Sequence, residues 1–295
     1  MKAERNSRNS RLFASSNASR ESTFQSAPVK EQREQKEEVV PYFVNATGRP
    51  LESLGVNAVE LALELGNLVD WDRYDLYRDE DDGLSSRDVF DFACRVGEAI
   101  LKKYPKATVL CQSDWGFTIA LASYIAAHGG RPVYAKALSY DSPLYKGIRE
   151  LGSYVEFKFP KVGRGRKFRE YSPDQVLLNL SSHSKTEWYP RSRYLGYGFE
   201  RTIDAVDTTM FDYTDIDQNR VEFEAFAYYI RENVNASEAV VTGEWSYVTA
   251  VVPLLIEAGI RVKYPGMYYN GYMTPDGRPC KSFYRYREYR FYRPE

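Results

Sequence analysis

An internal repeat limits what this chain can fold into more than any other feature of its sequence. The stretch from Ala107 to Ala137 can be aligned, without a gap, with a stretch that contains Glu238 to Gly266. The alignment pairs Asp114-Trp115 with Glu244-Trp245, and it also pairs glycines at positions that would end the following helix. A strand, a polar turn, an apolar helix and a second strand therefore occur twice in one order, which indicates one structural unit used twice.

Similarity outside this alignment favours the same interpretation. Earlier in each copy, "YFVNATGRP" corresponds to "LLNLSSHSK", and "VFDFA" corresponds to "FEAFA". At the end of each copy, "KFREY" resembles "RYREY". Chance similarity between amphipathic helices is the alternative for any single block, but several blocks in the same order favour a duplication.

The composition of the chain changes near its start. Residues 1–38 are rich in serine, asparagine, arginine, glutamate and glutamine and lack a sustained hydrophobic period, so we predict a disordered tail. The rest divides into a first module at 39–172 and a second at 173–295. In each module short β-branched runs alternate with helical segments, such as those expected at 86–104 and 220–233. This order predicts an α/β fold of two Rossmann-like modules in tandem, each a mostly parallel sheet with helices on both faces and a C-terminal antiparallel strand or hairpin.

Charge and cysteine content exclude several classes of function. The 40 basic and 41 acidic residues give a net charge of −1, which argues against broad binding to duplex nucleic acid. Three widely spaced cysteines suit neither a disulfide framework nor a zinc site, so we expect a reducing, cytoplasmic location. No apolar run approaches the roughly 20 residues that span a bilayer. Without a Walker A loop, a GxGxxG fingerprint or a ligand cluster, we expect no metal and no cofactor.

Polar turns after two strands of each module form the candidate ligand site. Such turns can flank one crevice in a doubly wound sheet, and the free N–H groups of the following helix favour an anion such as a phosphate. Hydroxyl groups there can donate to phosphate or ribose oxygens, while Arg49 or His183 could offset negative charge. The candidate ligand-binding residues are Asn45, Thr47, Gly48, Arg49, Gln112, Ser113, Asp114 and Trp115 in the first module and Asn179, Ser181, Ser182, His183, Thr242, Gly243, Glu244, Trp245 and Ser246 in the second.

Each of these residues also has a structural interpretation. The hydroxyls and acids can be ordinary helix caps, with Asp114 and Glu244 interacting with the helix dipoles. Trp115 and Trp245 could stack on a base, but packing in the core is the preferred interpretation. His183 could act as a general base near neutral pH, so His183 and Arg49 are the candidate catalytic residues.

The C-terminal stretch from Lys281 to Glu295 alternates arginine with aromatic residues. Such a mixture can stack on RNA and neutralise its charge, or it can form a twisted edge strand that its arginines keep soluble. The first module carries only the shorter "RKFREY" at the corresponding end, which favours the strand. RNA binding through this stretch is a secondary hypothesis.

The motifs of the second module resemble those of the CARF family, the stand-alone CRISPR-associated proteins with a CRISPR-associated Rossmann fold. The family pattern is an Asn-x-Ser-x-His turn, a Gly-Glu turn before an apolar helix, and a terminal Arg-Glu-Tyr strand. In the first module Gly48-Arg49 replaces the Ser-His pair and Ser113-Asp114 replaces Gly-Glu. The resemblance covers nearly everything after residue 40, and the second module matches at Asn179, Ser181, His183, Gly243, Glu244, Arg287, Glu288 and Tyr289.

The resemblance implies a nucleotide second messenger as ligand, typically a cyclic oligoadenylate of antiviral signalling, bound in a groove between two modules. In most relatives the groove lies on a dimer twofold, so this chain would be an intramolecular pseudo-dimer, with further homodimer formation left open. Some relatives cleave the ligand without a metal by aligning a ribose 2′-hydroxyl with its phosphodiester, so a ring nuclease is the enzymatic alternative. A structural or RNA-associated accessory protein is the third possibility.

Overall fold

Two five-stranded β-sheets, one in each half of the chain, share one strand order. The computed structural model describes residues 41–71, 85–137, 151–163, 165–170, 176–180, 202–204, 216–273 and 279–293. The first sheet contains β1 (Tyr42–Asn45), β2 (Asn67–Asp70), β3 (Thr108–Leu110), β4 (Arg131–Ala137) and β5 (Leu151–Glu156). The second contains β6 (Val176–Leu180), β7 (Thr202–Asp204), β8 (Ala236–Val241), β9 (Arg261–Met273) and β10 (Pro279–Glu288). Their orders, β2-β1-β3-β4-β5 and β7-β6-β8-β9-β10, give each strand a counterpart at the same place in the other sheet.

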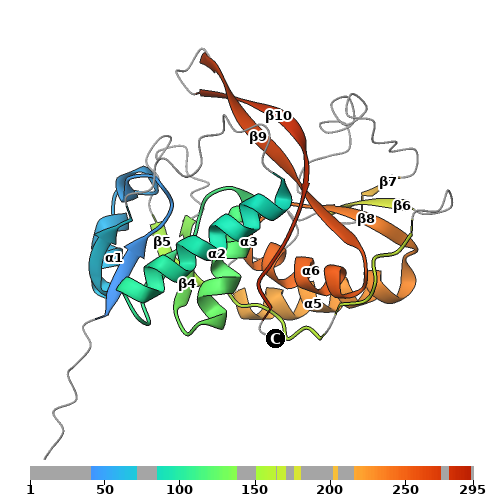
Figure 1. Cartoon of the computed structure of the whole chain (residues 1–295), viewed down its shortest axis with the longest axis horizontal. Coiled ribbons are helices and arrows are strands. Elements are labelled where there is room, and N and C mark those ends of the chain that lie inside the picture. Colours follow the sequence, from blue (N-terminus) through green and yellow to red (C-terminus); the bar gives the residue numbers. More distant parts are fainter. Residues whose placement is uncertain are drawn as a thin grey trace, which may run out of the picture. The chain divides into compact units, whose positions relative to one another are not determined.

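Strand direction is also the same in the two sheets. In each, the first four strands are parallel and the fifth is antiparallel to the fourth. The described helices are η1 (Leu51–Ser53), α1 (Ala58–Leu65), α2 (Ser86–Lys103), α3 (Trp115–Ala127), α5 (Ile216–Asn233) and α6 (Trp245–Glu257) (Figure 1). The prediction of two Rossmann-like α/β modules, each closed by an antiparallel strand, is therefore confirmed.

Both sheets belong to one compact unit, which extends from Val40 to Glu295. The module boundary at residue 172 lies within this unit and stays a prediction, as does the origin of the modules by duplication. The tail predicted at 1–38 lies outside the described residues.

Alternating residues of the first sheet pack on opposite faces. Phe43 on β1 and Leu110 on β3 pack in one cluster with residues of α1, whereas Val44 and Val109 pack in another with residues of α2 and α3. This alternation follows from the two-residue period of a β-strand. Helices therefore cover both faces of the first sheet.

Helix α2 shows how the sequence produces these elements. Ser85 Oγ accepts a hydrogen bond from the backbone N–H of Asp88 (3.2 Å), and the Asp88 carboxylate accepts one from the N–H of Ser85 (2.8 Å). This reciprocal capping box satisfies donors that an uncapped helix would leave unpaired. The buried face of the helix repeats at helical spacing and consists of Val89, Ala93, Val96, Gly97 and Ile100.

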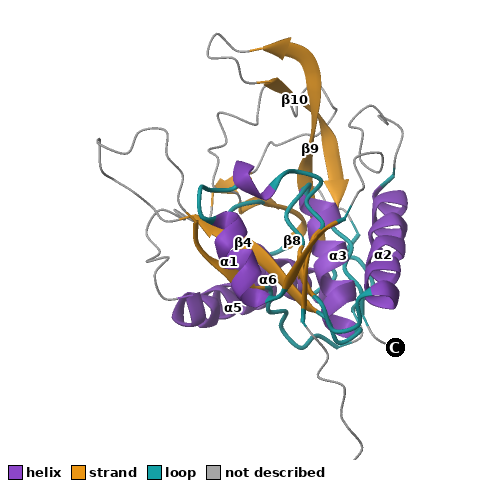
Figure 2. Ribbon diagram, turned by 90° about the vertical axis from the view of Figure 1, so that its left-hand side faces the viewer, coloured by secondary structure: helices purple, strands orange, loops and turns teal. Residues whose placement is uncertain are grey.

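Strands β9 and β10 continue beyond the second sheet as a two-stranded ribbon (Figures 1 and 2). Strand β9 pairs with β8 from Arg261 to Lys263, and with β10 as far as Met273. Strand β10 is the edge strand of its sheet and ends at Glu288. The strand interpretation of the arginine-aromatic stretch is therefore confirmed over residues 281–288.

The segment that follows β5 lies on the second module. The backbone N–H of Arg166 donates to the carbonyl of Glu257 (2.9 Å), and that of Arg169 donates to the carbonyl of Gly259 (2.8 Å). The guanidinium of Arg169 donates at 3.0–3.1 Å to carbonyls between the end of α5 and the start of β8, those of Arg231, Val234 and Ala236. The "KFREY" block is thus not the counterpart of "RYREY", because residues 165–170 lie outside the strands and β5 closes the first sheet.

The end of β10 and the segment that follows it lie on the first module. The backbone N–H of Glu288 donates to Ser86 Oγ at the start of α2 (2.9 Å), and that of Tyr292 donates to Ser123 Oγ in α3 (2.7 Å). The centroid of the Tyr292 ring lies 5.0 Å from that of Tyr124. The two closing segments therefore cross, and each contacts helices of the other module.

Candidate functional site

The polar turns of each module begin at neighbouring strand ends. In the first sheet Asn45 of β1 lies opposite Leu110 of β3, and in the second Leu180 of β6 lies opposite Val241 of β8. Strands β1 and β6 are also the strands at which the chain reverses its order across the sheet. Open α/β sheets bind ligands at this switch point, so the topology puts the candidate turns where a ligand site is expected.

The turn after β1 is built around two buried polar side chains. Asn45 Nδ2 donates to the carbonyl of Arg49 (2.8 Å) and to Asp70 Oδ1 (2.9 Å), while Asn45 Oδ1 accepts from the hydroxyl of Thr47 (2.7 Å). Thr47 Oγ1 also accepts the N–H of Arg49 (3.1 Å). Gly48 takes a φ of +70°, a left-handed conformation that glycine adopts without strain. Asn45 and Thr47 therefore shape the turn, and Arg49 lies exposed at its end.

The turn after β3 uses its polar groups within the chain. Asp114 is the N-cap of α3, and its Oδ1 accepts from the N–H groups of Gly116 (3.0 Å) and Phe117 (3.4 Å). Gln112 Oε1 accepts the N–H of Ala135 on β4 (3.0 Å). A phosphate at this helix start would therefore meet a carboxylate that already occupies the helix N–H groups.

The turn after β8 has the same plan. Glu244 is the N-cap of α6, and its Oε2 accepts from both the N–H (2.7 Å) and the hydroxyl of Ser246. Gly243 before it has a φ of +143°, and Thr242 is buried. Asp114 and Glu244 therefore both act as helix caps, in agreement with the structural interpretation of these residues. In the turn after β6, Asn179 is buried, and Ser181, Ser182 and His183 lie outside the described residues.

Trp115 and Trp245 bring the two helix starts together. Their ring centroids lie 4.4 Å apart, with the ring planes inclined by 44°. Trp245 also contacts Phe157, which follows β5, edge to face at 5.8 Å. Both indoles are half-buried and pack against the hydrophobic clusters, so the preferred packing interpretation describes their contacts.

Each module places a tyrosine at the helix start of the other module. Tyr264 on β9 lies so close to α3 that a Cβ added to Gly116 would overlap its hydroxyl and ring. Tyr134 on β4 lies beside the first turn of α6: its burial, and next the carboxylate of Glu244, raise the pKa of its hydroxyl far above the usual value. Sequence analysis missed this pair, although the gapless alignment that pairs Trp115 with Trp245 also pairs the two tyrosines.

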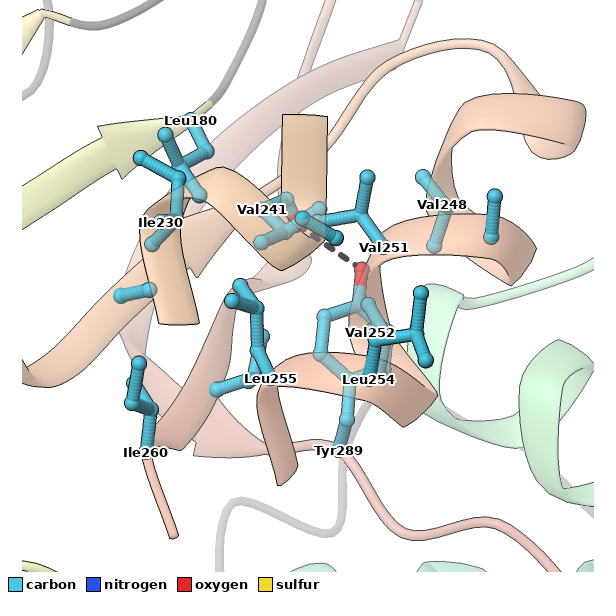
Figure 3. Close-up of a cluster of buried hydrophobic side chains, with 14 of the residues drawn as sticks. Leu180, Ile230, Val241, Val248, Val251, Val252, Leu254, Leu255, Ile260 and Tyr289 are labelled. Atoms are coloured by element: carbon cyan, nitrogen blue, oxygen red, sulfur yellow. Dashed lines mark hydrogen bonds between the residues drawn. The ribbon is translucent and has the colours of Figure 1, made fainter. Parts of the chain in front are cut away.

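Tyr289, of the Arg-Glu-Tyr element, supports the end of β8. Its hydroxyl donates to the carbonyl of Val241 (2.9 Å) within the buried cluster around α6, as Figure 3 shows. Its ring centroid lies 4.7 Å from that of Tyr264. Burial raises the pKa of the Tyr289 hydroxyl, and the nearby charge of Asp114 adds to this shift. Tyr289 therefore holds the strand that leads into Thr242 and connects it with the α3 turn.

The described residues contain no group of three histidine, cysteine, aspartate or glutamate side chains that could hold a metal ion. None of their helices has the length and apolar character needed to cross a membrane.

The sequence matches no protein-family model and no curated protein sequence. Among solved structures, the Acinetobacter baumannii Cap4 SAVED/CARF-domain containing receptor with the cyclic trinucleotide 3′3′3′-cAAA is similar over 83% of this chain and 49% of that chain, with 8% identity and a TM-score of 0.38. The same receptor with 2′3′3′-cAAA is similar over 84% and 51%, with 10% identity and a TM-score of 0.36. The chain thus spans about half the length of these receptors.

Proposed function

We propose that this protein binds a nucleotide second messenger at the paired turns of its two modules. The observation that carries the proposal is the contact between Trp115 and Trp245, because it joins the first turns of α3 and α6. Each turn lies at a switch point of its sheet, where open α/β sheets bind ligands. Two such sites in contact favour a ligand that repeats its own chemistry, as a cyclic oligonucleotide does.

The ligand class that we propose is a cyclic oligoadenylate of antiviral signalling. The CARF-type motifs of the sequence support it, among them Gly243-Glu244 before α6 and the Arg-Glu-Tyr element. Because carboxylates cap both α3 and α6, the phosphates are expected outside these helix starts. Arg49, an exposed residue at the end of the β1 turn, is the phosphate contact that we propose in the first module.

Calorimetry with the full chain tests this function. The cyclic trinucleotides of the receptors described above are suitable first probes, beside larger cyclic oligoadenylates and the linear forms. We expect binding of at least one cyclic probe, and failure of every probe would contradict the proposal. Chromatography of the same mixtures after incubation with a chelator separates simple binding from metal-independent ring opening.

A pair of variants locates the binding surface. Ser113 is exposed in the α3 turn, so Ser113→Leu adds bulk there, and we expect it to weaken binding at least about 10-fold. Glu98→Leu adds a similar side chain on the exposed face of α2 and serves as the matched control. Equal affinities of the two variants would place the ligand elsewhere.

A further inference from the structure

Three buried oxygens near the start of α6 have no hydrogen-bond partner among the described residues. They are the hydroxyl oxygens of Tyr134 and Thr242 and the Oε1 oxygen of Glu244. The side chains of Tyr134 and Thr242 are each 2% exposed. Because folded proteins rarely leave buried polar atoms unpaired, three such atoms in one region indicate a polar group that comes from outside the chain.

The three oxygens come from two elements that meet at this turn. Thr242 and Glu244 flank Gly243 directly before α6, and Tyr134 extends from β4 of the first module toward the Glu244 carboxylate and Ser246. The other oxygen of Glu244 already accepts two hydrogen bonds from Ser246. The Oε1 oxygen therefore remains as an acceptor, with two hydroxyl groups in the same region.

The equivalent turn of the first module differs. There Asp114 accepts from Gly116 and Phe117, and Gln112, at the position of Thr242, accepts the N–H of Ala135. The two turns are thus alike in backbone plan but differ in the use of their polar groups. A ligand with repeated units would meet two unequal halves.

We propose that the α6 turn binds a hydrogen-bond donor of the nucleoside part of the ligand, either the amino group of a base or a ribose hydroxyl, and not a phosphate. The inference rests on the proposed function. A carboxylate accepts N–H and O–H groups strongly but repels a phosphate. The Thr242 and Tyr134 hydroxyls can each donate or accept, so they complete the contacts of either donor.

Ligand analogues distinguish the two sources of the donor. The probe is 3′3′3′-cAAA, compared with a cyclic trinucleotide in which purine replaces adenine and with one built from deoxyadenosine. The first analogue lacks the amino groups and the second lacks the 2′-hydroxyls. We expect one analogue to bind at least about 10-fold more weakly than the probe, since the carboxylate would lose its partner. Equal binding of all three compounds overturns the inference, and failure of every cyclic probe, larger rings included, overturns the proposed function with it.

Substitution of Glu244 shows whether this turn causes the preference. Glu244→Gln keeps the size of the side chain and a capping oxygen but removes the charge, so we expect it to lose the preference for the probe over the weaker analogue. Asp114→Asn makes the same change in the first module and is expected to keep the preference. A preference retained by Glu244→Gln, or lost equally in both variants, overturns the assignment.

Two further variants test the hydroxyls. Thr242→Val removes an unpaired oxygen, so the unliganded protein should melt at the same temperature or a higher one, whereas Tyr134→Phe also removes the interaction of its hydroxyl with Glu244 and is compared only for its response to the probe. The stabilisation on adding 3′3′3′-cAAA should become smaller in both. A lower melting temperature without ligand, combined with unchanged stabilisation by the probe, would mean that the oxygens hold an internal water, and it would overturn the inference.

Discussion

The indole of Trp115 lies against that of Trp245, with ring centroids 4.4 Å apart. These are the first residues of α3 and α6, so the strongest similarity within the sequence coincides with a contact between the two modules. The contact joins two separate hydrophobic clusters, because Trp245 packs against both. Its removal should therefore weaken the whole compact unit.

Trp245→Ala should destabilise the protein by about 3 kcal/mol, because it removes a large aromatic surface and leaves a cavity between the clusters. Urea unfolding followed by circular dichroism measures this change. Tyr229→Ala, at a side chain 60% exposed on α5, is the control and should change stability by less than about 0.5 kcal/mol. Similar costs for the two variants would contradict the role of the tryptophan pair.

Gly116→Ala should destabilise the protein by about 1–3 kcal/mol, because the new Cβ overlaps the hydroxyl and ring of Tyr264. Alanine is otherwise the better helix former, so a loss of stability would be due to this close approach. In a Tyr264→Leu background the cost of Gly116→Ala should be smaller, which a double-mutant cycle measures. Additive effects would show that the two residues do not interact.

Arg169→Lys should destabilise the protein by about 2 kcal/mol, because an ammonium group cannot reproduce the guanidinium contacts with three carbonyls between the end of α5 and the start of β8. Lys167→Ala is the control: its pair with Glu170 is exposed, and its loss should cost less than about 0.5 kcal/mol. Thermal unfolding of both variants is the measurement. If Arg169→Lys melts like the unchanged protein, the segment after β5 does not hold the second module.

Ser123→Ala should speed hydrogen exchange at the far end of the chain, because Tyr292 N–H would lose its acceptor in α3. Mass spectrometry of peptides that contain residues 289–293 measures the effect. Ser53→Ala removes a local contact with Pro50 and should leave these peptides unchanged. Unchanged exchange in Ser123→Ala would contradict the contact between the C-terminal segment and the first module.

Local patterns in the sequence predicted the helices and their caps. The helix expected at 86–104 is α2, Ser86–Lys103, because its capping box and buried face are both visible in the sequence. The helix expected at 220–233 begins earlier, at Ile216. Asp114 and Glu244 stand directly before apolar helices, so their capping role could also be predicted.

Contacts between the modules could not be predicted in the same way. Tyr134 and Tyr264 have the pattern of ordinary buried strand residues, and their approach to the opposite helix depends on how the modules pack. The "KFREY" block failed as a strand because Arg169 bonds to carbonyls more than 60 positions away, which no local pattern shows. The group of unpaired oxygens at the α6 turn could not be predicted either, because one of them belongs to Tyr134 of β4 and joins the group only when the modules pack together.

The crossing of the closing segments makes the two halves mutually dependent. The first half supplies the backbone that covers the end of α6, and the second half supplies the backbone that covers α3. Each half therefore receives part of its covering from the other, although each has a complete sheet. We therefore expect the two halves to unfold together as one cooperative unit.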